Sequence, residues 1–160
     1  MAHGDLPPEV GARTLVAVFA SPVARYLLHF AADVGFRTVL VEPDPARADG
    51  TVAVLNESTV DGNTDIVVTD HDRPELGPFL RDALALPARW VGVIGSVRHT
   101  APHLAALRSL GVDEADIARV HRPVGLNIGS RTPAEVALAT LAGLIADRND
   151  RPGGFTWARP

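Results

Sequence analysis

Short runs rich in β-branched residues alternate along the chain with longer stretches of helical periodicity, and this alternation restricts the fold more than any other feature. The pattern is typical of βαβ units, in which helices bury both faces of a parallel sheet. The runs with strand character are 14–20, 37–42, 51–55, 65–69 and 90–94, of which 51–55 is the weakest. We therefore predict one α/β domain with a Rossmann-like, doubly wound parallel sheet.

Helices are predicted between these strands and after them. The first should begin after Ser21 and end at Gly35, because glycine is common just beyond the end of a helix. Two more are expected, one from Pro74 to Leu84 and one that ends near Gly111. The apolar stripe that the first helix should bury is Val23, Leu27, Ala31 and Val34.

The last helix has the clearest start signal in the sequence. Thr132, Pro133 and Glu135 occupy the N-cap, first-turn and capping-box positions. We expect the helix to begin there, to run to about residue 148 and to face the sheet with one apolar stripe. The residues of that stripe are Ala134, Leu138, Leu141 and Ile145.

The length of the chain suits a single domain, because 160 residues bury enough surface for one core. We place this domain at 14–148, between a flexible N-terminal arm at 1–13 and a frayed tail at 149–160. The arm is rich in proline and acidic residues and lacks an apolar stretch, so we expect neither a signal peptide nor a membrane span. A cytoplasmic location is the expectation that follows.

Composition excludes several kinds of chemistry. The chain has no cysteine, which excludes disulfides, thiolate metal ligands and a cysteine nucleophile. The formal net charge is −4, lysine is absent and no basic run occurs. Surfaces that bind nucleic-acid phosphates need clustered Lys and Arg, so no nucleic-acid partner is expected.

Ligands of doubly wound sheets bind beyond the carboxyl ends of the strands, which makes the loops there the candidate sites. The first loop, 19–24, lacks the glycines of the G-x-G-x-x-G dinucleotide fingerprint, and Pro22 removes one N–H donor from the helix start. We interpret Ser21 as a helix cap, with ligand binding as the alternative. Glu42, about twenty residues further on, either hydrogen-bonds a ribose or lies in a solvated turn.

The loop after the run 65–69 gathers polar side chains within four residues. Thr69, Asp70, His71 and Asp72 suit a ligand or a proton, and with a partner from another loop they suit a metal. The alternative is an acidic turn that caps the helix near Pro74.

The loop after the run 90–94 is the best anion-binding candidate. Gly92 and Gly95 allow another group to approach the backbone, and Ser96 and Arg98 follow with a hydroxyl and a guanidinium. A packing turn is the alternative.

Two further segments hold candidate residues. His99 and His103 lie four residues apart and are interpreted as solvated helix positions rather than as metal ligands. His121, Gly125, Gly129 and Arg131 lie in the segment that leads into the last helix. A rigid backbone before a helix N-terminus suits an anion, and the alternative is a connection that folds over the sheet edge.

Three motifs in the second half of the chain belong together. They are Trp90-Val-Gly-Val-Ile-Gly-Ser96 with Arg98, His121-x-Pro123-x-Gly125-Leu126-x-Ile128-Gly129, and Thr132-Pro133-x-Glu135. With these motifs the chain resembles the XdhC/CoxI family, accessory proteins of molybdenum-containing hydroxylases such as xanthine and carbon monoxide dehydrogenases. Thr69-Asp70-His71-Asp72 is similar to the family's T-x-H-D strand end. The resemblance covers 14–148 and corresponds to the family's C-terminal Rossmann domain.

The resemblance implies a non-catalytic accessory or maturation factor. Its implied ligand is the molybdenum cofactor or another phosphorylated, nucleotide-like molecule, held through Ser96, Arg98, His121 and Arg131. The implied partners are subunits of a molybdenum hydroxylase or a separate protein with the family's N-terminal domain, and a homodimer is left open.

The chain departs from the family pattern in two places. The family's first loop reads G-x-G-H-V-A, of which only Val23 and Ala24 are present. The family's N-terminal domain, with its glycine- and cysteine-bearing segment, is also missing. We expect either a separate chain that supplies it or a shortened paralogue with a binding or assembly role.

Two other functions stay open. One is an NAD(P)-dependent oxidoreductase that uses Glu42 on the ribose, against which Phe19, Ser21 and Pro22 argue. The other is a structural module that pairs with a partner carrying the N-terminal domain.

Overall fold

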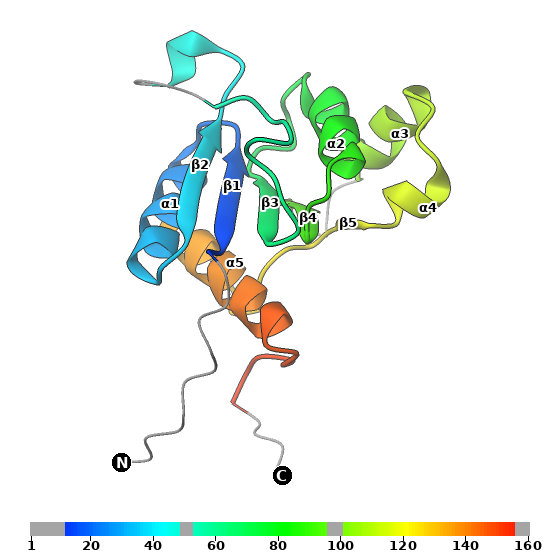
Figure 1. The fold of residues 1–160 in the computed structure, drawn as a ribbon. Helices are drawn as coiled ribbons and strands as arrows, with labels where there is room; N and C mark the ends of the chain where they lie inside the picture. Colours follow the sequence, from blue (N-terminus) through cyan, green and yellow to red (C-terminus); the bar gives the residue numbers. More distant parts are fainter. Residues whose placement is uncertain (1–11, 49–52, 96–100, 156–160) are drawn as a thin grey trace.

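A computed structural model describes residues 12–48, 53–95 and 101–155. Within these residues a five-stranded, fully parallel sheet has the order β2-β1-β3-β4-β5 (Figure 1). The strands are β1 Thr14–Val18, β2 Arg37–Val41, β3 Thr64–Val68, β4 Trp90–Val93 and β5 Val120–His121. The predicted doubly wound, Rossmann-like α/β domain is therefore confirmed.

The strand register brings the candidate loops together. Val18 pairs with Val41 on one side and with Val68 on the other, so β1, β2 and β3 end at the same level. The chain runs from β1 outward to β2 and returns to β3 on the opposite side of β1, which makes this edge the point where strand order reverses. Such a point is where doubly wound sheets bind ligands.

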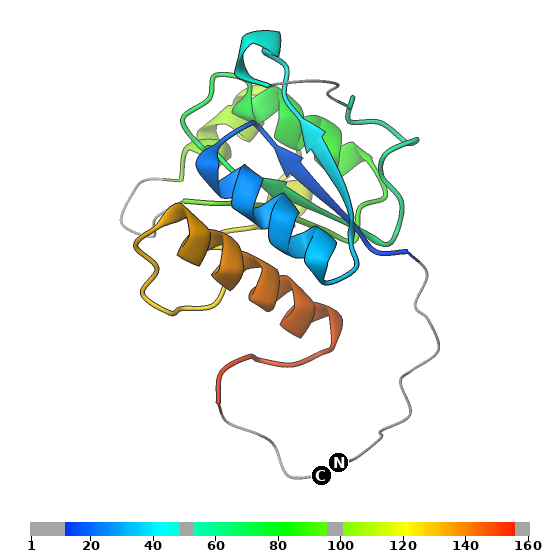
Figure 2. The same cartoon turned by 90° about the vertical axis from the view of Figure 1, so that its left-hand side faces the viewer.

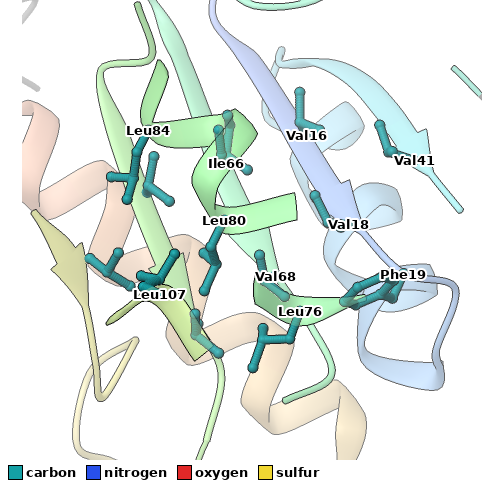
Figure 3. Close-up of a cluster of buried hydrophobic side chains, with 14 of the residues drawn as sticks. Val16, Val18, Phe19, Val41, Ile66, Val68, Leu76, Leu80, Leu84 and Leu107 are labelled. Atoms are coloured by element: carbon teal, nitrogen blue, oxygen red, sulfur yellow. The ribbon is translucent and has the colours of Figure 1, made fainter. Parts of the chain in front are cut away.

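Helices cover both faces of the sheet. The helices α1, Pro22–Asp33, and α5, Pro133–Arg148, lie side by side on one face (Figure 2). The other face carries α2, Leu76–Ala85, α3, Pro102–Ser109, and the short α4, Glu114–Ile117 (Figure 1). Because side chains alternate along a strand, the two faces have separate apolar clusters. Figure 3 shows the α2 cluster, with Phe19 at the end of β1.

The second and third strands are joined without an intervening helix in the described part. The helical segment in the described residues of this connection is the 3-10 turn Pro45–Arg47, whose N-cap Asp44 accepts a hydrogen bond from Ala46 N. The predicted strand at 51–55 is wrong for its described part, because 53–55 is irregular and only Ala53 N reaches the edge of β2, at Leu40 O. Residues 51–52 lie outside the described residues. The sequence analysis also missed β5, whose two residues are too few to give a strand pattern.

The predicted starts of the first and last helices agree with the structure. Ser21 caps α1, since its Oγ accepts a hydrogen bond from Ala24 N at 3.0 Å. Thr132 and Glu135 form the expected capping box at the start of α5.

The predicted apolar stripes are only partly right. Helix α1 buries Leu27 and Ala31 as expected, but Val34 follows the last helical residue and is exposed. Helix α5 leaves Leu138 54% exposed. Of the predicted stripe it buries Leu141, and the other buried residues are Ala137, Ala139, Thr140 and Leu144. The reason is that α5 packs against α1 and against the loop before it as well as against the sheet, so one stripe does not describe its buried surface.

Near both predicted ends of the domain, the described residues pack against the rest of the fold. Arg13 donates a hydrogen bond to Val34 O at 2.6 Å and lies over the Phe36 ring. At the other end Arg151 N donates to Ala146 O, which turns the chain back on α5. The expectations for 1–11 and 156–160 lie outside the described residues.

Candidate functional site

A groove with a volume of about 730 Å³ opens at the carboxyl edge of the sheet. One wall consists of residues that follow β3 and β4, and the other consists of segment 123–130 with the first turns of α5. The predicted site residues that line this groove are Thr69, His71, Gly95, Gly125 and Gly129.

Thr69 links the groove to the first loop. Its Oγ1 lies 2.9 Å from Phe19 O, to which it donates, and 2.9 Å from Ser21 Oγ. The contact exists because Val18 and Val68 are in register, so the next residues of β1 and β3 meet. Ser21 therefore caps a helix and also touches the groove wall, although it does not itself line the groove.

His71 is held by the backbone of the neighbouring strand. Its Nδ1 lies 3.2 Å from Ile94 O, and a carbonyl oxygen only accepts, so Nδ1 carries a proton. Its Nε2 lies 3.5 Å from the carboxylate of Asp72, which is largely exposed. Asp70 accepts a hydrogen bond from Asp72 N and closes the turn. The predicted acidic cap of the next helix is wrong, because the N-cap of α2 is Glu75 and makes no side-chain cap bond.

The second wall rests on the backbone of α5. Gly125 has φ +92°, and a Cβ at this position would lie 3.0 Å from the carbonyl carbon of Ala139. Leu126 N donates to Ala139 O at 3.1 Å. The predicted glycine-rich segment is therefore a connection fixed to the helix as well as a groove wall.

Gly92 in β4 and Gly95 just after it leave space that other groups of the protein fill. A Cβ on Gly95 would lie 2.8 Å from Arg122 Nε, and a Cβ on Gly92 would meet the Trp90 ring and Val124. The close approach of another group to these glycines, which the sequence predicted, is confirmed. The sequence did not indicate which side chains would approach.

Two other candidate histidines among the described residues, His103 and His121, do not line the groove. His121 stacks on Trp90, with ring centroids 4.9 Å apart and an interplanar angle of 7°, and lines a separate hollow beside α5. His103 is 5% exposed, so its predicted solvated position is wrong. Helix α3 turns it inward one turn before the buried Leu107, and burial, together with the charge of Arg122, lowers the pKa of its imidazole. Ser96, Arg98 and His99 lie outside the described residues.

Arg131 lies just before α5 and is exposed. Its backbone N–H donates to Glu135 Oε2 at 2.6 Å, and Glu135 also accepts from Thr132 N. The Glu135 carboxylate thus already occupies the place in which an anion would meet this helix N-terminus. Because the backbone N–H of Arg131 is already used in this way, a ligand would contact Arg131 through its side chain.

Glu42 lies at the carboxyl end of β2 in a buried ion pair. Arg73 Nη1 and Nη2 donate to its two oxygens at 3.0 and 2.7 Å, while Ala20 N and Asp44 N donate at 2.7 and 3.0 Å. Burial works against ionisation of Glu42, but the hydrogen bonds from Arg73, Ala20 and Asp44 outweigh it and lower its pKa from 4.5 to about 2. The pairing also raises the pKa of Arg73. The sequence analysis missed Arg73, because nothing in its neighbourhood distinguishes it from a surface arginine.

The described residues include neither a metal-binding cluster nor a helix that could span a membrane. No three His, Asp or Glu side chains among them converge in a way that could hold a metal ion. In the same part of the chain, no helix combines the length and the apolarity needed to cross a membrane.

The parallel sheet, its strand order and the groove at its carboxyl edge define a doubly wound α/β protein of the Rossmann type. The family model described as the XdhC Rossmann domain matches residues 15–144. The chain therefore belongs to the XdhC family through this domain, as the sequence resemblance implied.

Two known proteins show how far this similarity extends. The uncharacterized protein YqeB of Escherichia coli K12 is 39% identical over 90 residues, which are 56% of this chain and 16% of YqeB. A crystal structure described as a xanthine dehydrogenase (BH1974) from Bacillus halodurans superimposes with a TM-score of 0.70 at 22% identity. That match covers 88% of this chain and 44% of the other, and it shows the fold. The chain spans less than half the length of either protein.

Proposed function

We propose that this domain is a non-catalytic accessory factor for a molybdenum-containing hydroxylase and that it binds the molybdenum cofactor, or a similar phosphorylated ligand, in the groove. One observation carries the proposal. Parts of the segments that give the chain its family resemblance, 69–71, 94–95 and 123–130, line this groove together although they are far apart in sequence. Membership of the XdhC family and the description of the Bacillus neighbour as a xanthine dehydrogenase support the link to such hydroxylases.

The chemistry of the groove suits a flat ring system with a charged group. Val124, Ile128 and Val136 make one wall apolar, and His71 with Asp70 makes the opposite wall polar. A pterin or a base needs both an apolar face and hydrogen-bonding partners for its edge. The guanidinium groups of Arg98 and Arg131 are the proposed partners of the phosphate.

The partner is proposed from the same evidence. A subunit of the hydroxylase, or a protein with the family's N-terminal domain, would dock beside the groove and receive or present the ligand. A cytoplasmic location belongs to this proposal, because the hydroxylase partner would be met there.

Thermal unfolding of the purified chain with molybdopterin, NAD, NADP and simple nucleotides tests the ligand. A ligand at one hundred times its dissociation constant stabilises the folded state by about 2.7 kcal/mol, which gives a clear rise in Tm. The proposal expects this rise with molybdopterin and its loss in His71→Ala and Arg131→Ala. The matched controls are His29→Ala and Arg25→Ala on α1, away from the groove.

Other outcomes would redirect the assignment. A rise with NAD or NADP, accompanied by cofactor-dependent hydride transfer, would favour the oxidoreductase. No rise with any ligand, together with complex formation with the purified hydroxylase, would favour a structural module.

A further inference from the structure

The groove takes up the β3–β4 half of the carboxyl edge of the sheet, whereas the Glu42–Arg73 ion pair spans the other half, at the tips of β1 and β2. We propose that the Glu42–Arg73 ion pair closes the β1–β2 half, so that this protein recognises one phosphorylated, nucleoside-like unit and gains no affinity from the second nucleoside of a dinucleotide. The ligand class in this statement rests on the proposed function, whereas the closure itself is tested separately below.

The ion pair spans the place where a dinucleotide would cross the sheet. Glu42 follows β2, Arg73 belongs to the loop after β3, and β1 lies between these strands. Arg73 therefore reaches across the tip of β1 to make its two hydrogen bonds. This tip is where the strand order reverses and where the dinucleotides of Rossmann proteins lie.

Glu42 has no acceptor position left for a ribose. A carboxylate offers about four acceptor positions, two on each oxygen. Oε2 accepts from Ala20 N and Arg73 Nη1, and Oε1 accepts from Asp44 N and Arg73 Nη2. A ribose hydroxyl would have to displace one of these donors, and the displaced donor is either a buried guanidinium or a backbone N–H.

In the first loop, too, groups of the protein itself take the place of a ligand. Phe19 stands where the fingerprint has its first glycine, and its φ of +75° is a conformation that favours glycine. Its ring is fully buried, with the Arg73 guanidinium 4.4 Å from the ring centroid. Phe19 N donates to Val41 O and Ala20 N donates to Glu42, so neither N–H is available to a pyrophosphate.

The open half lies on the other side of Thr69. The groove begins at Thr69 and continues past Gly95 to the segment 123–130, and neither Glu42 nor Arg73 lines it. A ligand seated there meets the closed half at the Ser21–Thr69 contact. One nucleoside-like unit fits this arrangement, whereas a second unit would need the volume that Arg73 and Phe19 fill.

Titration of the ¹⁵N-labelled full chain with AMP, ADP-ribose and NAD tests the closure. For the unaltered protein the dissociation constants of AMP and NAD should agree within about threefold, because the second nucleoside adds no contact. The Ala20 and Asp44 amide signals should not move. A dissociation constant for NAD at least thirtyfold below that for AMP, with movement of both amides, would overturn the proposal.

Variants of Arg73 that open the closed half provide the second arm of the test, after the titration of the unaltered protein. Arg73→Met removes the charge and keeps an apolar side chain of similar length, so ADP-ribose affinity should rise at least tenfold and the Ala20 amide should shift. Arg73→Lys keeps the charge but loses the two-pronged geometry, so ADP-ribose affinity should rise about threefold. This variant replaces the methionine variant in the test if the latter does not fold. Arg81→Met on the exposed side of α2 is the control and should change nothing.

The two arms separate this inference from the proposed function. If neither AMP nor NAD binds the unaltered protein but the Arg73 variants gain ADP-ribose binding, the nucleotide-like ligand class fails and the closure stands. If a folded Arg73 variant gains no affinity, the closure is wrong whatever the groove binds.

Discussion

Arg148 Nε lies 2.8 Å from Asp65 Oδ2, although 83 residues separate the two in sequence. The pair joins the end of α5 to the start of β3 at the amino edge of the sheet, opposite the groove. Asp65 is fully buried, and Arg89 donates to its other oxygen at 2.7 Å. Arg148 also donates to Asn63 O, just before β3. Its guanidinium therefore joins the last helix both to β3 and to the residue that precedes this strand.

Arg148→Ala should therefore destabilise the fold strongly. It leaves a buried carboxylate with one partner, and the loss of one partner of a buried ion pair costs about 3 kcal/mol. Urea unfolding measures the change. Arg81→Ala, at an exposed ion pair with Asp82, is the control and should cost at most about 0.5 kcal/mol. Equal effects at the two sites would contradict the structural role given to Arg148.

Phe19 offers a test of backbone strain. At most positions outside turns, a protein with alanine is more stable than the same protein with glycine. Phe19 has φ +75°, a conformation in which any L-residue is strained. Both truncations remove the same buried ring, so Phe19→Ala and Phe19→Gly should both be destabilised, with the glycine variant more stable than the alanine variant by about 1 kcal/mol. Urea unfolding of the two variants decides this, and the reverse order would show that the left-handed conformation is not retained.

Stability should depend on Glu42 at acidic pH. Its pKa is about 2 in the folded protein against an ordinary 4.5, so its contribution is fully present above about pH 5 and is lost as pH falls toward 2. The shift corresponds to about 3 kcal/mol. In Glu42→Gln this part of the pH dependence should disappear from unfolding curves recorded between pH 2 and 7. Glu57→Gln, at an exposed glutamate, should retain it.

Gly125→Ala should damage both stability and the groove. The new Cβ would lie 3.0 Å from the α5 backbone, and φ is +92°, so the variant should lose about 3 kcal/mol and bind the groove ligand more weakly. Gly111→Ala is the matched control, because φ is +74° but nothing lies within 4 Å of the added carbon. It should lose about 1 kcal/mol and keep ligand binding. Thermal unfolding with and without ligand measures both effects.

The sequence was informative where local chemistry decides structure. The caps at Ser21 and Thr132 depend on hydrogen bonds within one turn, and both were predicted correctly. The doubly wound fold class followed from the alternation of strand and helix patterns, and the family followed from short motifs at strand ends.

The errors arose where contacts between segments distant in sequence determine which side chains are buried and which are paired. Leu138 is exposed because α5 turns its other sides to α1 and to the loop at Gly125. His103 is buried because α3 is held against α2. The partnership of Arg73 with Glu42 depends on β1 lying between β2 and β3, and no spacing along the chain encodes that order.

The contact between Gly125 and α5 separates two kinds of evolutionary change. A Cβ on Gly143 would lie 3.2 Å from Gly125 Cα, so here the loop meets the helix backbone to backbone. Side chains on the outer surface of α5, such as the exposed Leu138, take no part in that contact. Substitutions there can change the outer surface of α5 while the shape of the groove wall is inherited unchanged, so these two surfaces are free to diversify independently.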